Sequence, residues 1–315
     1  MNQSARASAP ASIGNIGVGF DVLGQAFDVA RDTVHAWREA GTGARLGRVT
    51  GIVDSLPASA RSNTALAAAA ALLDSAGADF SVRLDIDKQI PVSAGIGGSA
   101  ASAVAAAVAV NALLETPLQT AELLPFALAG ETVSADPPPW DNVMASLHGG
   151  LVIAARLDPV LIAPLPVPDG ITAILFHPEA RTNTAAAREV LSNQVPMQTA
   201  VEHARRISAF TLGCATGNHE LIRAGLEDVL VEPQRAFLLP ELPEIKAAAH
   251  EAGALGCSFS GSGPSVFAWA DDHCAAAVET AMAAAFAEAG RKARAYTAPL
   301  ASPGARLETV AEPVR

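Results

Sequence analysis

A glycine-rich loop stands between an alternating apolar and polar stretch and an alanine-rich stretch. It reads Pro91-Val-Ser-Ala-Gly-Ile-Gly-Gly-Ser-Ala-Ala101, with three glycines in four positions. Glycine lets the backbone turn its N–H groups inward, and a helix that begins near Ser99 adds unpaired N–H donors and the positive end of its dipole. Together these groups form a cradle for an anion such as a phosphate.

The loop differs from two well-known phosphate motifs. It lacks the Gly-Lys-Ser/Thr ending of a Walker A motif, and it lacks the GxGxxG spacing of a dinucleotide-binding fold. A tight strand-to-helix turn, with glycines present for steric reasons, explains the same residues. Taken alone, the loop sequence does not distinguish between a phosphate site and a structural turn.

A second glycine-rich segment, residues 10–24, sets Asn15 and Asp21 among apolar residues. One interpretation is a hairpin or bulged turn in which Asn and Asp form the turn. We favour the other, in which the glycines bring the backbone close to a ligand and the two side chains hydrogen-bond it. A carboxylate on an apolar segment is costly unless it is paired, so Asp21 is expected to meet a ligand ammonium or a basic residue.

Further polar residues have both a structural and a functional interpretation. Asn63 or Thr64 is expected to cap a helix, and capping alone explains both. Glu131 is either a charge at a helix end or a metal ligand. Asp141 comes shortly after three prolines. It is either a helix cap or, together with Asn142, one of two polar side chains that the helix start brings to a functional site.

The elements on both sides of the loop are predicted from their patterns. Residues 82–90 alternate apolar and polar side chains, which predicts a strand that leads into the loop. Residues 99–114 are rich in Ala, Val and Leu and are long enough for about four turns of a mostly buried helix. Strand, glycine loop and helix are the components of a phosphate site.

Two domains are expected from the length of 315 residues and from the proline-rich stretch at 158–170. The second half predicts the order β-α-α-α-β-β-α-β, typical of an antiparallel sheet with helices on one face. Residues past 304 are expected to form a loose tail. The predicted fold class is α+β, with a first domain at residues 1–163 and a second at residues 164–315.

Composition excludes several classes of protein. The net charge is −11 and there are only three lysines, which argues against a nucleic-acid partner or an anionic membrane surface. The three cysteines are an odd number without CxxC spacing, so reduced thiols are expected rather than disulfides or a zinc site. The chain shows neither the apolar core of a signal peptide nor a run long enough to span a membrane. A cytoplasmic protein is expected.

Three segments together carry a resemblance to a known family. Residues 10–24, 91–101 and 259–267 resemble the three signature motifs of the GHMP family of small-molecule kinases. Four segments are most similar to the family members that phosphorylate L-homoserine, namely residues 12–24, 141–143, 184–188 and 232–235. The resemblance implies transfer of the γ-phosphoryl group of ATP to the side-chain hydroxyl of L-homoserine, a step of threonine biosynthesis that requires Mg²⁺. It also implies a ribosomal-S5-like N-terminal domain, a ferredoxin-like C-terminal domain and a site between them.

The resemblance further implies roles for individual residues. Three are expected to be catalytic: Lys88, Asp141 and Asn142. Contact with the nucleotide is expected from Asn63, Pro91, Val92, Ser93, Ala94, Gly95, Ile96, Gly97, Gly98, Ser99, Ala100 and Ala101. Contact with the substrate is expected from Asn15, Asp21, Asn142, Thr184, Arg188, Arg235, Gly261 and Gly263. Ser99 and Glu131 are expected to hold Mg²⁺, and a homodimer is implied by the resemblance alone.

The chemistry of these residue types agrees with that assignment. An amino acid needs a carboxylate for its ammonium, which Asp21 supplies, and guanidinium groups for its carboxylate, which Arg188 and Arg235 supply. Mg²⁺ binds a few hard oxygens together with phosphate, and the Ser99 hydroxyl with the Glu131 carboxylate is a sufficient set. Whether Asp141 also acts as a general base is open at this point.

Two positions depart from the family pattern. Gly98 replaces the first serine of a Ser-Ser pair, which keeps the backbone cradle but leaves Ser99 alone to serve the metal. Pro139 replaces a histidine that commonly stands three residues before Asn142. Two alternatives therefore stay open: a kinase of the same family acting on another small alcohol, and a non-catalytic relative that binds ligand without releasing ADP.

Overall fold

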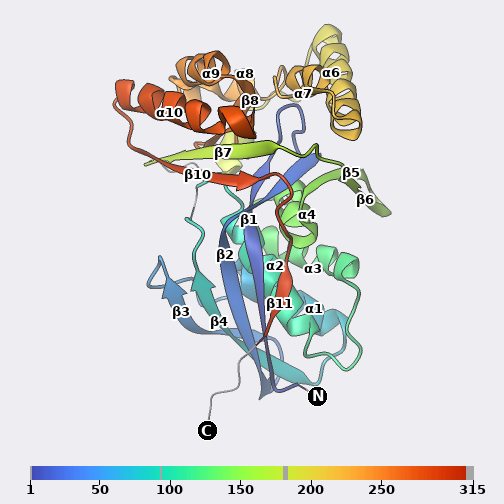
Figure 1. The fold of residues 1–315 in the computed structure, drawn as a ribbon. Coiled ribbons are helices and arrows are strands. Elements are labelled where there is room, and N and C mark those ends of the chain that lie inside the picture. Colours follow the sequence, from blue (N-terminus) through green and yellow to red (C-terminus); the bar gives the residue numbers. More distant parts are fainter. Residues whose placement is uncertain (1, 93, 180–183, 310–315) are drawn as a thin grey trace.

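The computed structural model of the chain describes residues 2–92, 94–179 and 184–309, with residues 184–186 described as backbone only. Over these residues the strands form two sheets, one of seven strands and one of four. Figure 1 shows the sheets at different levels of the molecule, with α1 to α4 beside the larger sheet and α9 and α10 over the smaller one. The predicted α+β class is confirmed.

Strands from both ends of the chain make up the larger sheet. Its strands are β1 (Ser4–Gly14), β2 (Leu23–Ala40), β3 (Ala44–Gly51), β4 (Phe80–Lys88), β5 (Leu151–Leu157), β6 (Val160–Leu165) and β11 (Arg306–Glu308). Their order is β11-β1-β2-β4-β3, and β5 pairs with β2 and β6. Only the pairing of β3 with β4 is parallel among the described strands. The predicted loose tail is wrong at residues 306–308, because β11 pairs with β1.

The strand and helix that were predicted around the glycine loop are confirmed. Residues 80–88 of β4 alternate between buried and half-buried, so their apolar side chains enter the core. α2 (Gly98–Asn111) is buried on nearly all sides, and its alanines let neighbouring elements approach closely. The helices on this side are α1 (Thr64–Ser75), α2, the 3₁₀ turn η1 (Thr120–Leu123), α3 (Leu124–Glu131) and α4 (Trp140–His148). The sheet and these helices fix the position of the glycine loop.

The smaller sheet has the predicted antiparallel topology. Its strands are β7 (Ile171–Pro178), β8 (Ala254–Phe259), β9 (Val266–Asp271) and β10 (Ala293–Pro299), in the order β10-β7-β9-β8. The other elements of this half are α5 (Thr184–Glu189), α6 (Met197–Thr216), α7 (His219–Gly225), α8 (Glu232–Arg235), η2 (Ala236–Leu238), α9 (Leu242–Glu251) and α10 (Asp272–Glu288). α6, α7 and α9 account for the three consecutive helices of the predicted order, and α5 and α8 are short helices additional to it.

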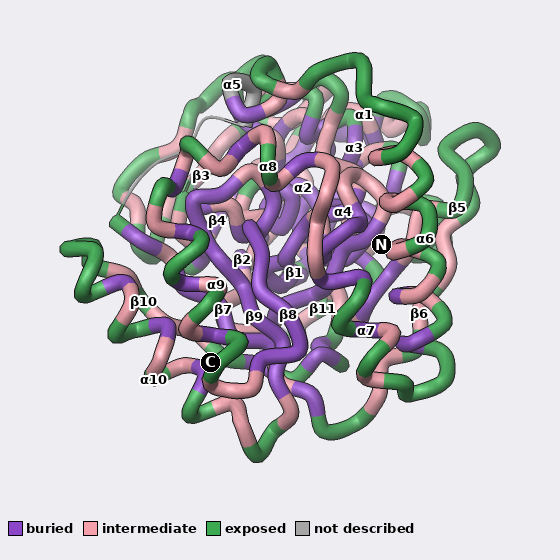
Figure 2. The backbone as a smooth tube through the Cα atoms, turned by 90° about the horizontal axis from the view of Figure 1, so that it is seen from above, coloured by how far each residue is buried: buried purple, intermediate pink, exposed green. Residues whose placement is uncertain are grey.

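Both faces of the smaller sheet are buried, because alternate residues of each strand enter different cores. Ile174 and Phe176 of β7 pack in the cluster that includes α9 and α10, whereas Leu175 joins the core of the larger sheet. Trp269 of β9 donates a hydrogen bond from Nε1 to Oε1 of Gln25 on β2, at 3.0 Å. Figure 2 shows the resulting buried centre, which contains strands of both sheets. The core of the larger sheet thus continues into the second half, which has a second core of its own under α9 and α10. The boundary predicted at residue 163, which falls inside β6, stays a prediction.

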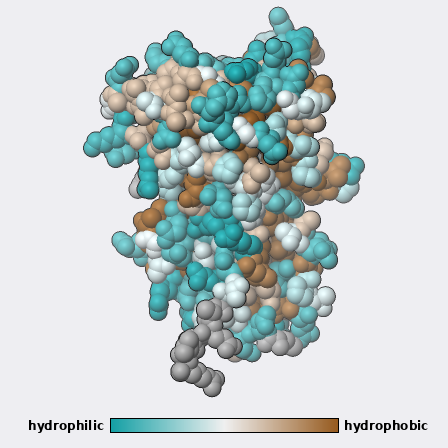
Figure 3. All heavy atoms as spheres, viewed as in Figure 1, coloured by the Kyte–Doolittle hydropathy of each residue, from teal (hydrophilic) through white to brown (hydrophobic). Residues whose placement is uncertain are grey.

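One apolar patch lies on the hairpin of β5 and β6, where Leu157, Val160 and Leu161 are about half exposed. In Figure 3 this hairpin forms part of the brown surface at the right edge. Within the described ranges, no helix combines the length and the apolar composition needed to cross a bilayer.

Candidate active site

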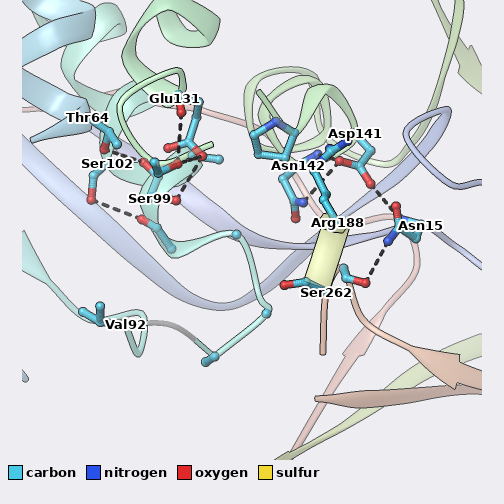
Figure 4. Close-up of a pocket in the computed structure, with 18 of the residues that line it drawn as sticks. Asn15, Thr64, Val92, Ser99, Ser102, Glu131, Asp141, Asn142, Arg188 and Ser262 are labelled. Atoms are coloured by element: carbon cyan, nitrogen blue, oxygen red, sulfur yellow. Dashed lines mark hydrogen bonds between the residues drawn. The ribbon is translucent and has the colours of Figure 1, made fainter. Parts of the chain in front are cut away.

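A pocket of about 600 Å³ lies where the two halves of the chain meet. Its volume is within the range of small-molecule sites, roughly 300–1,000 Å³. The lining residues are Asn15, Phe20, Asp21, Leu56, Pro57, Ser62, Asn63, Thr64, Lys88, Val92, Ala94, Gly95, Gly97, Gly98, Ser99, Ala100, Ser102, Glu131, Ser134, Pro139, Asp141, Asn142, Arg188, Arg235, Gly261 and Ser262. Figure 4 shows two groups of polar side chains in it, one around Ser99 and Glu131 and the other around Asn142, Asp141 and Arg188.

The glycine loop forms one wall of the pocket and ends at the N-terminus of α2. Gly95 and Gly97 have φ of 71° and 67°, in the left-handed region that favours glycine. A Cβ atom on Gly97 would lie 1.9 Å from Oγ of Ser12, so a side chain does not fit there. The first N–H groups of a helix have no acceptor within that helix. The glycine conformations and the helix start on which the predicted anion cradle depends are therefore present, and anion binding there stays a prediction.

Not every residue predicted to contact the nucleotide lines the pocket. Those that do are Asn63, Val92, Ala94, Gly95, Gly97, Gly98, Ser99 and Ala100. Ile96 and Ala101 are buried in the core instead, and Pro91 is outside the lining as well. Ser93 lies outside the described residues. Among the described loop residues, Pro91, Ile96 and Ala101 thus stay outside the pocket lining, and contact of the others with a nucleotide stays a prediction.

Residues 260–265, within the third glycine-rich segment, hydrogen-bond to backbone carbonyls of the glycine loop. Ser260 donates a hydrogen bond from Oγ to the Gly95 carbonyl at 2.7 Å, and Ser265 donates one to the Ala94 carbonyl at 2.5 Å. A Cβ atom on Gly95 would lie 2.6 Å from the Gly263 carbonyl oxygen. Gly261 lines the pocket and Gly263 does not. The prediction that Gly263 contacts substrate is replaced by a supporting role, because its backbone faces the loop.

Lys88 lies beneath the loop. Its ammonium pairs with the Asp32 carboxylate and donates to the Gly98 carbonyl at 2.6 Å and to Oγ of Ser102 at 3.3 Å. The side chain is 3% exposed. All three donors of the ammonium are thus engaged by protein groups, and a direct contact between Lys88 and a phosphate stays a prediction. A Cβ atom on Gly98 would lie 3.1 Å from Nζ of Lys88, which gives a physical reason for glycine at this position.

Ser99 and Glu131 meet at the end of the pocket beside the glycine loop. Oε2 of Glu131 accepts hydrogen bonds from Oγ of Ser99 and of Ser134, both at 3.0 Å. Oε1 is buried and has no hydrogen-bond partner among the described residues. Burial raises the pKa of Glu131 to about 7, against the hydrogen bonds from the two serines and the charge of Lys88. A buried carboxylate oxygen without a partner, beside a hydroxyl, fits a divalent cation such as Mg²⁺.

Asn63 caps α1. Its Oδ1 accepts from the backbone N–H groups of Ala65 and Leu66 at 3.1 and 3.2 Å, and its Nδ2 donates to the Pro57 carbonyl at 2.8 Å. Thr64, the first residue of α1, donates from its hydroxyl to the Ser99 carbonyl at 3.1 Å. The capping interpretation is confirmed, and the contact between Asn63 and the nucleotide stays a prediction.

The opposite end of the pocket is built on the hairpin loop between β1 and β2. Asn15 and Asp21 have φ of 60° and 56°, in the left-handed region, and Oδ1 of Asn15 accepts from the Asp21 N–H at 3.2 Å. Nδ2 of Asn15 donates to the Gly261 carbonyl at 2.7 Å. The loop at residues 15–22 is therefore a hairpin turn that also lines the pocket. The turn interpretation is confirmed, and a hydrogen bond from Asn15 or Asp21 to a ligand stays a prediction.

Asp141, at the start of α4, holds this loop in place. Its Oδ2 accepts from the Asn15 N–H at 2.7 Å, and its Oδ1 accepts from the Asn142 N–H at 2.8 Å. A Cβ atom on Gly14 would lie 2.5 Å from Oδ2, and one on Gly24 would lie 2.0 Å from the Asp141 carbonyl oxygen. The glycines at both ends of the hairpin loop thus allow α4 to approach. Burial and the negative charge of Asp21 raise the pKa of Asp141, against the two backbone donors.

Asp21 and Arg188 form an ion pair across the pocket. Nη1 and Nη2 of Arg188 donate to the two carboxylate oxygens of Asp21, both at 2.7 Å. The Arg188 guanidinium also lies 5.6 Å from the ring centre of Phe20, and that of Arg235 lies 5.3 Å from it. The sequence offered a ligand ammonium or a basic residue as partner for Asp21, and the structure shows a basic residue.

Arg235, in α8, is almost completely buried. It donates from Nε to the Ala187 carbonyl at 2.9 Å and from Nη1 to the Gly261 carbonyl at 3.3 Å. Burial and the neighbouring Arg188 lower the pKa of Arg235. Two guanidinium groups on one pocket wall favour an anionic group of a ligand. The backbone of Thr184 begins α5, and its side chain lies outside the described part of the chain.

Sequence reasoning did not single out Phe20, Asp32 and Ser12. Phe20 lies beside Asp21 in the same motif, so proximity in sequence was a signal for it. Oγ of Ser12 donates to Oδ1 of Asn142 at 3.0 Å, which orients that amide. A role for Asp32 was only weakly indicated by the sequence, as a single carboxylate among strand residues. The structure shows that this carboxylate is fully buried.

The comparisons with known proteins cover nearly the whole chain. The family model for the GHMP kinases N terminal domain matches residues 63–150, and the one for the GHMP kinases C terminal domain matches residues 207–288. The chain is 42% identical to a homoserine kinase of Xanthomonas campestris pv. campestris (strain B100), with 97% of this chain and 94% of the relative covered. It is 43% identical to a homoserine kinase of Xylella fastidiosa (strain 9a5c), with 96% of this chain and 94% of the relative covered. It superposes on the crystal structure of a homoserine kinase from Cytophaga hutchinsonii with a TM-score of 0.92 and 34% identity, over 98% of each chain.

Proposed function

The chain belongs to the GHMP kinase family, and from that membership we propose that it transfers the γ-phosphoryl group of ATP to the side-chain hydroxyl of L-homoserine. Relatives that cover nearly its full length are homoserine kinases, and a homoserine kinase structure shares its fold. The product is O-phospho-L-homoserine, which places the reaction in threonine biosynthesis.

One observation carries the proposal: Asn142 links the phosphate end of the pocket to the acceptor end. Its Oδ1 lies 3.0 Å from the position that a Cβ atom on Gly97 would take, and its Nδ2 donates to Oδ1 of Asp141 at 3.2 Å. Asn142 thus stands beside the glycine loop on one side and is linked through Asp141 to the loop that carries Asp21 on the other. A hydroxyl held beside Asn142 has the phosphate cradle next to it, as an in-line transfer requires.

The Asp21–Arg188 pair supports a zwitterionic acceptor. The α-ammonium of an amino acid replaces Arg188 at Asp21, and the α-carboxylate replaces Asp21 at Arg188, so that each charged group keeps a partner. Arg235 adds a second cation near the carboxylate. A ligand with only one of the two charges leaves one side chain unpaired in a partly desolvated pocket, which is unfavourable.

The residues of the chain contribute mainly position and charge to the reaction. A bond forms between the hydroxyl oxygen and the γ-phosphorus, the bond from that phosphorus to the bridging oxygen breaks, and the hydroxyl proton is lost. Mg²⁺, held by Ser99 and Glu131 together with phosphate oxygens, would neutralise charge on the transferred group. The backbone N–H groups at the start of α2 face the same charge.

Asp141 is the acidic side chain that stands beside Asn142, and its role as general base stays a proposal. Both of its oxygens already accept backbone N–H groups, which holds the carboxylate in one orientation. Its raised pKa favours accepting a proton at neutral pH. A cytoplasmic location and a homodimer are likewise proposals that rest on the family likeness.

The experiment that tests the function is ADP release with ATP and Mg²⁺, with L-homoserine, L-serine, mevalonate, shikimate and galactose supplied singly. We expect release with L-homoserine in clear preference to the other alcohols. Preferred release with a neutral alcohol would contradict the substrate assignment and keep the kinase. Release with none of them would favour the non-catalytic relative that Gly98 and Pro139 leave open.

A further inference from the structure

Asp32 lies under the glycine loop and holds both ends of it. Its Oδ1 accepts from the backbone N–H groups of Gln89 and Ile90, each at 3.0 Å, where the chain leaves β4 and enters the loop. Its Oδ2 accepts from Oγ of Ser102 at 2.6 Å, in the first turns of α2, and from the Lys88 ammonium. One carboxylate therefore joins the entry and the exit of the loop.

Lys88 extends this connection to the first residue of α2. Its ammonium donates to the Gly98 carbonyl at 2.6 Å while it is paired with Asp32. Gly98 begins α2, so the ion pair fixes the helix end whose N–H groups face the pocket. Because both charged groups are almost completely buried, either one left alone would be strongly unfavourable.

The strand β2 determines the place of Asp32. Thr33 lies opposite Asp87 in the pairing of β2 with β4, so Asp32 stands beside Lys88 at the very end of β4. On its other side, β2 pairs with β1 and shows a register shift between Pro10 and Ala11, directly after the pairs that include Asp32. The carboxylate thus comes from a central strand that is paired on both sides, which gives the loop a rigid support.

We propose that Asp32 is a positioning residue for the nucleotide: it fixes the backbone N–H groups of the glycine loop and of the α2 N-terminus in the orientation that binds the phosphates. This inference rests on the proposed function and adds a residue outside the predicted site. Asp32 is not among the residues that line the pocket, and it acts through Lys88, Ser102 and the backbone at residues 89–90.

The main test compares nucleotide binding with acceptor binding in Ser102→Ala, a small change that leaves the ion pair intact. The dissociation constant for ADP with Mg²⁺, measured by titration calorimetry, is expected to rise by about three- to tenfold, because the Ser102 hydroxyl no longer joins Asp32, the Gly98 carbonyl and Lys88. The KM for ATP is expected to rise with it, and the KM for L-homoserine is expected to stay within about twofold. Ser302→Ala is the matched control, because Ser302 is also buried, donates to a carbonyl at 2.9 Å and lies outside the pocket.

A second variant tests the carboxylate itself and separates positioning from folding. Asp32→Asn leaves the Lys88 charge unpaired, so it is expected to lower the melting temperature and to weaken ADP binding by more than about tenfold. The double variant Asp32→Asn with Lys88→Met removes both buried charges. We expect it to recover much of the lost stability and to keep the weakened ADP binding, because the two ends of the loop are still not joined.

Several outcomes would overturn the proposal. Unchanged ADP binding in folded Ser102→Ala would do so. If Asp32→Asn does not fold, ADP binding by Ser102→Ala and by the double variant tests the positioning role instead. A rise confined to the KM for L-homoserine would also contradict it. If the parent protein binds ADP but does not phosphorylate L-homoserine, only the substrate assignment fails. If the parent does not bind ADP at all, both proposals fail.

Discussion

The phosphate end and the acceptor end of the pocket are built in different ways. At the proposed phosphate end the central segment is residues 88–102, with Thr64 and Glu131 beside it. At the acceptor end the groups come from four segments in both halves of the chain, and they are charged side chains. The phosphate end therefore centres on one continuous segment that Asp32, Ser260 and Ser265 hold from other parts of the chain, whereas the acceptor end is assembled entirely from distant segments.

The two ends also differ in how their charges are satisfied without a ligand. The buried charges of Lys88 and Asp32 support the loop and have partners that a ligand need not displace. Asp21 and Arg188 are partly exposed in the pocket and pair with each other. We infer that the phosphate end is preorganised for a group that all nucleotide-dependent relatives share, and that the acceptor end selects the ligand by exchange of an ion pair.

The largest effect is expected from removing the predicted metal ligands. In the double variant Ser99→Ala with Glu131→Gln, kcat is expected to fall about 1,000-fold, because charge on the transferred group is no longer neutralised by a held cation. ADP release at saturating Mg²⁺, ATP and L-homoserine measures this. Thermal unfolding of the same variant is the control for folding, and turnover within threefold of the parent would contradict the metal role.

The second prediction breaks the acceptor end alone. Arg188→Leu removes the guanidinium that, in the proposed exchange, donates to the substrate carboxylate in place of Asp21. Hydrogen bonds to charged groups contribute about 1.5–3 kcal/mol each, so kcat/KM for L-homoserine is expected to fall about 100-fold or more. The KM for ATP is expected to change less than threefold. Arg205→Leu, at a mostly exposed arginine of α6, is the matched control. A comparable loss of ATP binding in Arg188→Leu would show that the two ends are not separable.

Substrate analogues sharpen the comparison without any mutation. A hydroxy acid that lacks the α-ammonium of homoserine, and an amino alcohol that lacks its α-carboxylate, are each expected to have a KM about 30-fold above that of L-homoserine. Each leaves one member of the Asp21–Arg188 pair without a partner. Steady-state ADP release gives both values. Equal KM values for the zwitterion and either analogue would exclude the ion-pair exchange.

The smallest effect concerns Asp141 and pH. Burial and the charge of Asp21 raise the pKa of Asp141 from 3.8 to about 7, so its folded form holds a proton that its unfolded form has lost between about pH 4 and pH 7. The contribution of this group to stability therefore decreases as pH rises through that range. Asp141→Asn does not titrate, and its stability relative to the parent is expected to increase by on the order of 1–2 kcal/mol between pH 5 and pH 8. Denaturant unfolding at both pH values measures the difference, and a constant difference would reject the raised pKa.

Much of the fold was determined by local sequence. The alternation in β4, the glycines at 95 and 97, and the alanine-rich α2 each specify a backbone conformation through neighbouring residues, and strand, loop and helix are all confirmed. The strands and the helices α6, α7, α9 and α10 of the second half were predicted in the right order for the same reason, whereas the short helices α5 and α8 were not in the predicted order. The three-residue β11 was missed because so short an edge strand shows no pattern of its own.

Only the tertiary structure decided which side chains pair. Lys88 meets Asp32 across 56 residues of sequence, and Arg188 meets Asp21 across 167. The sequence identified both Lys88 and Arg188 as site residues but could not give their partners. Local conformation depends on the residues next to each other in the chain, whereas the partner of a charged side chain depends on which strand or loop packs against it once the chain has folded.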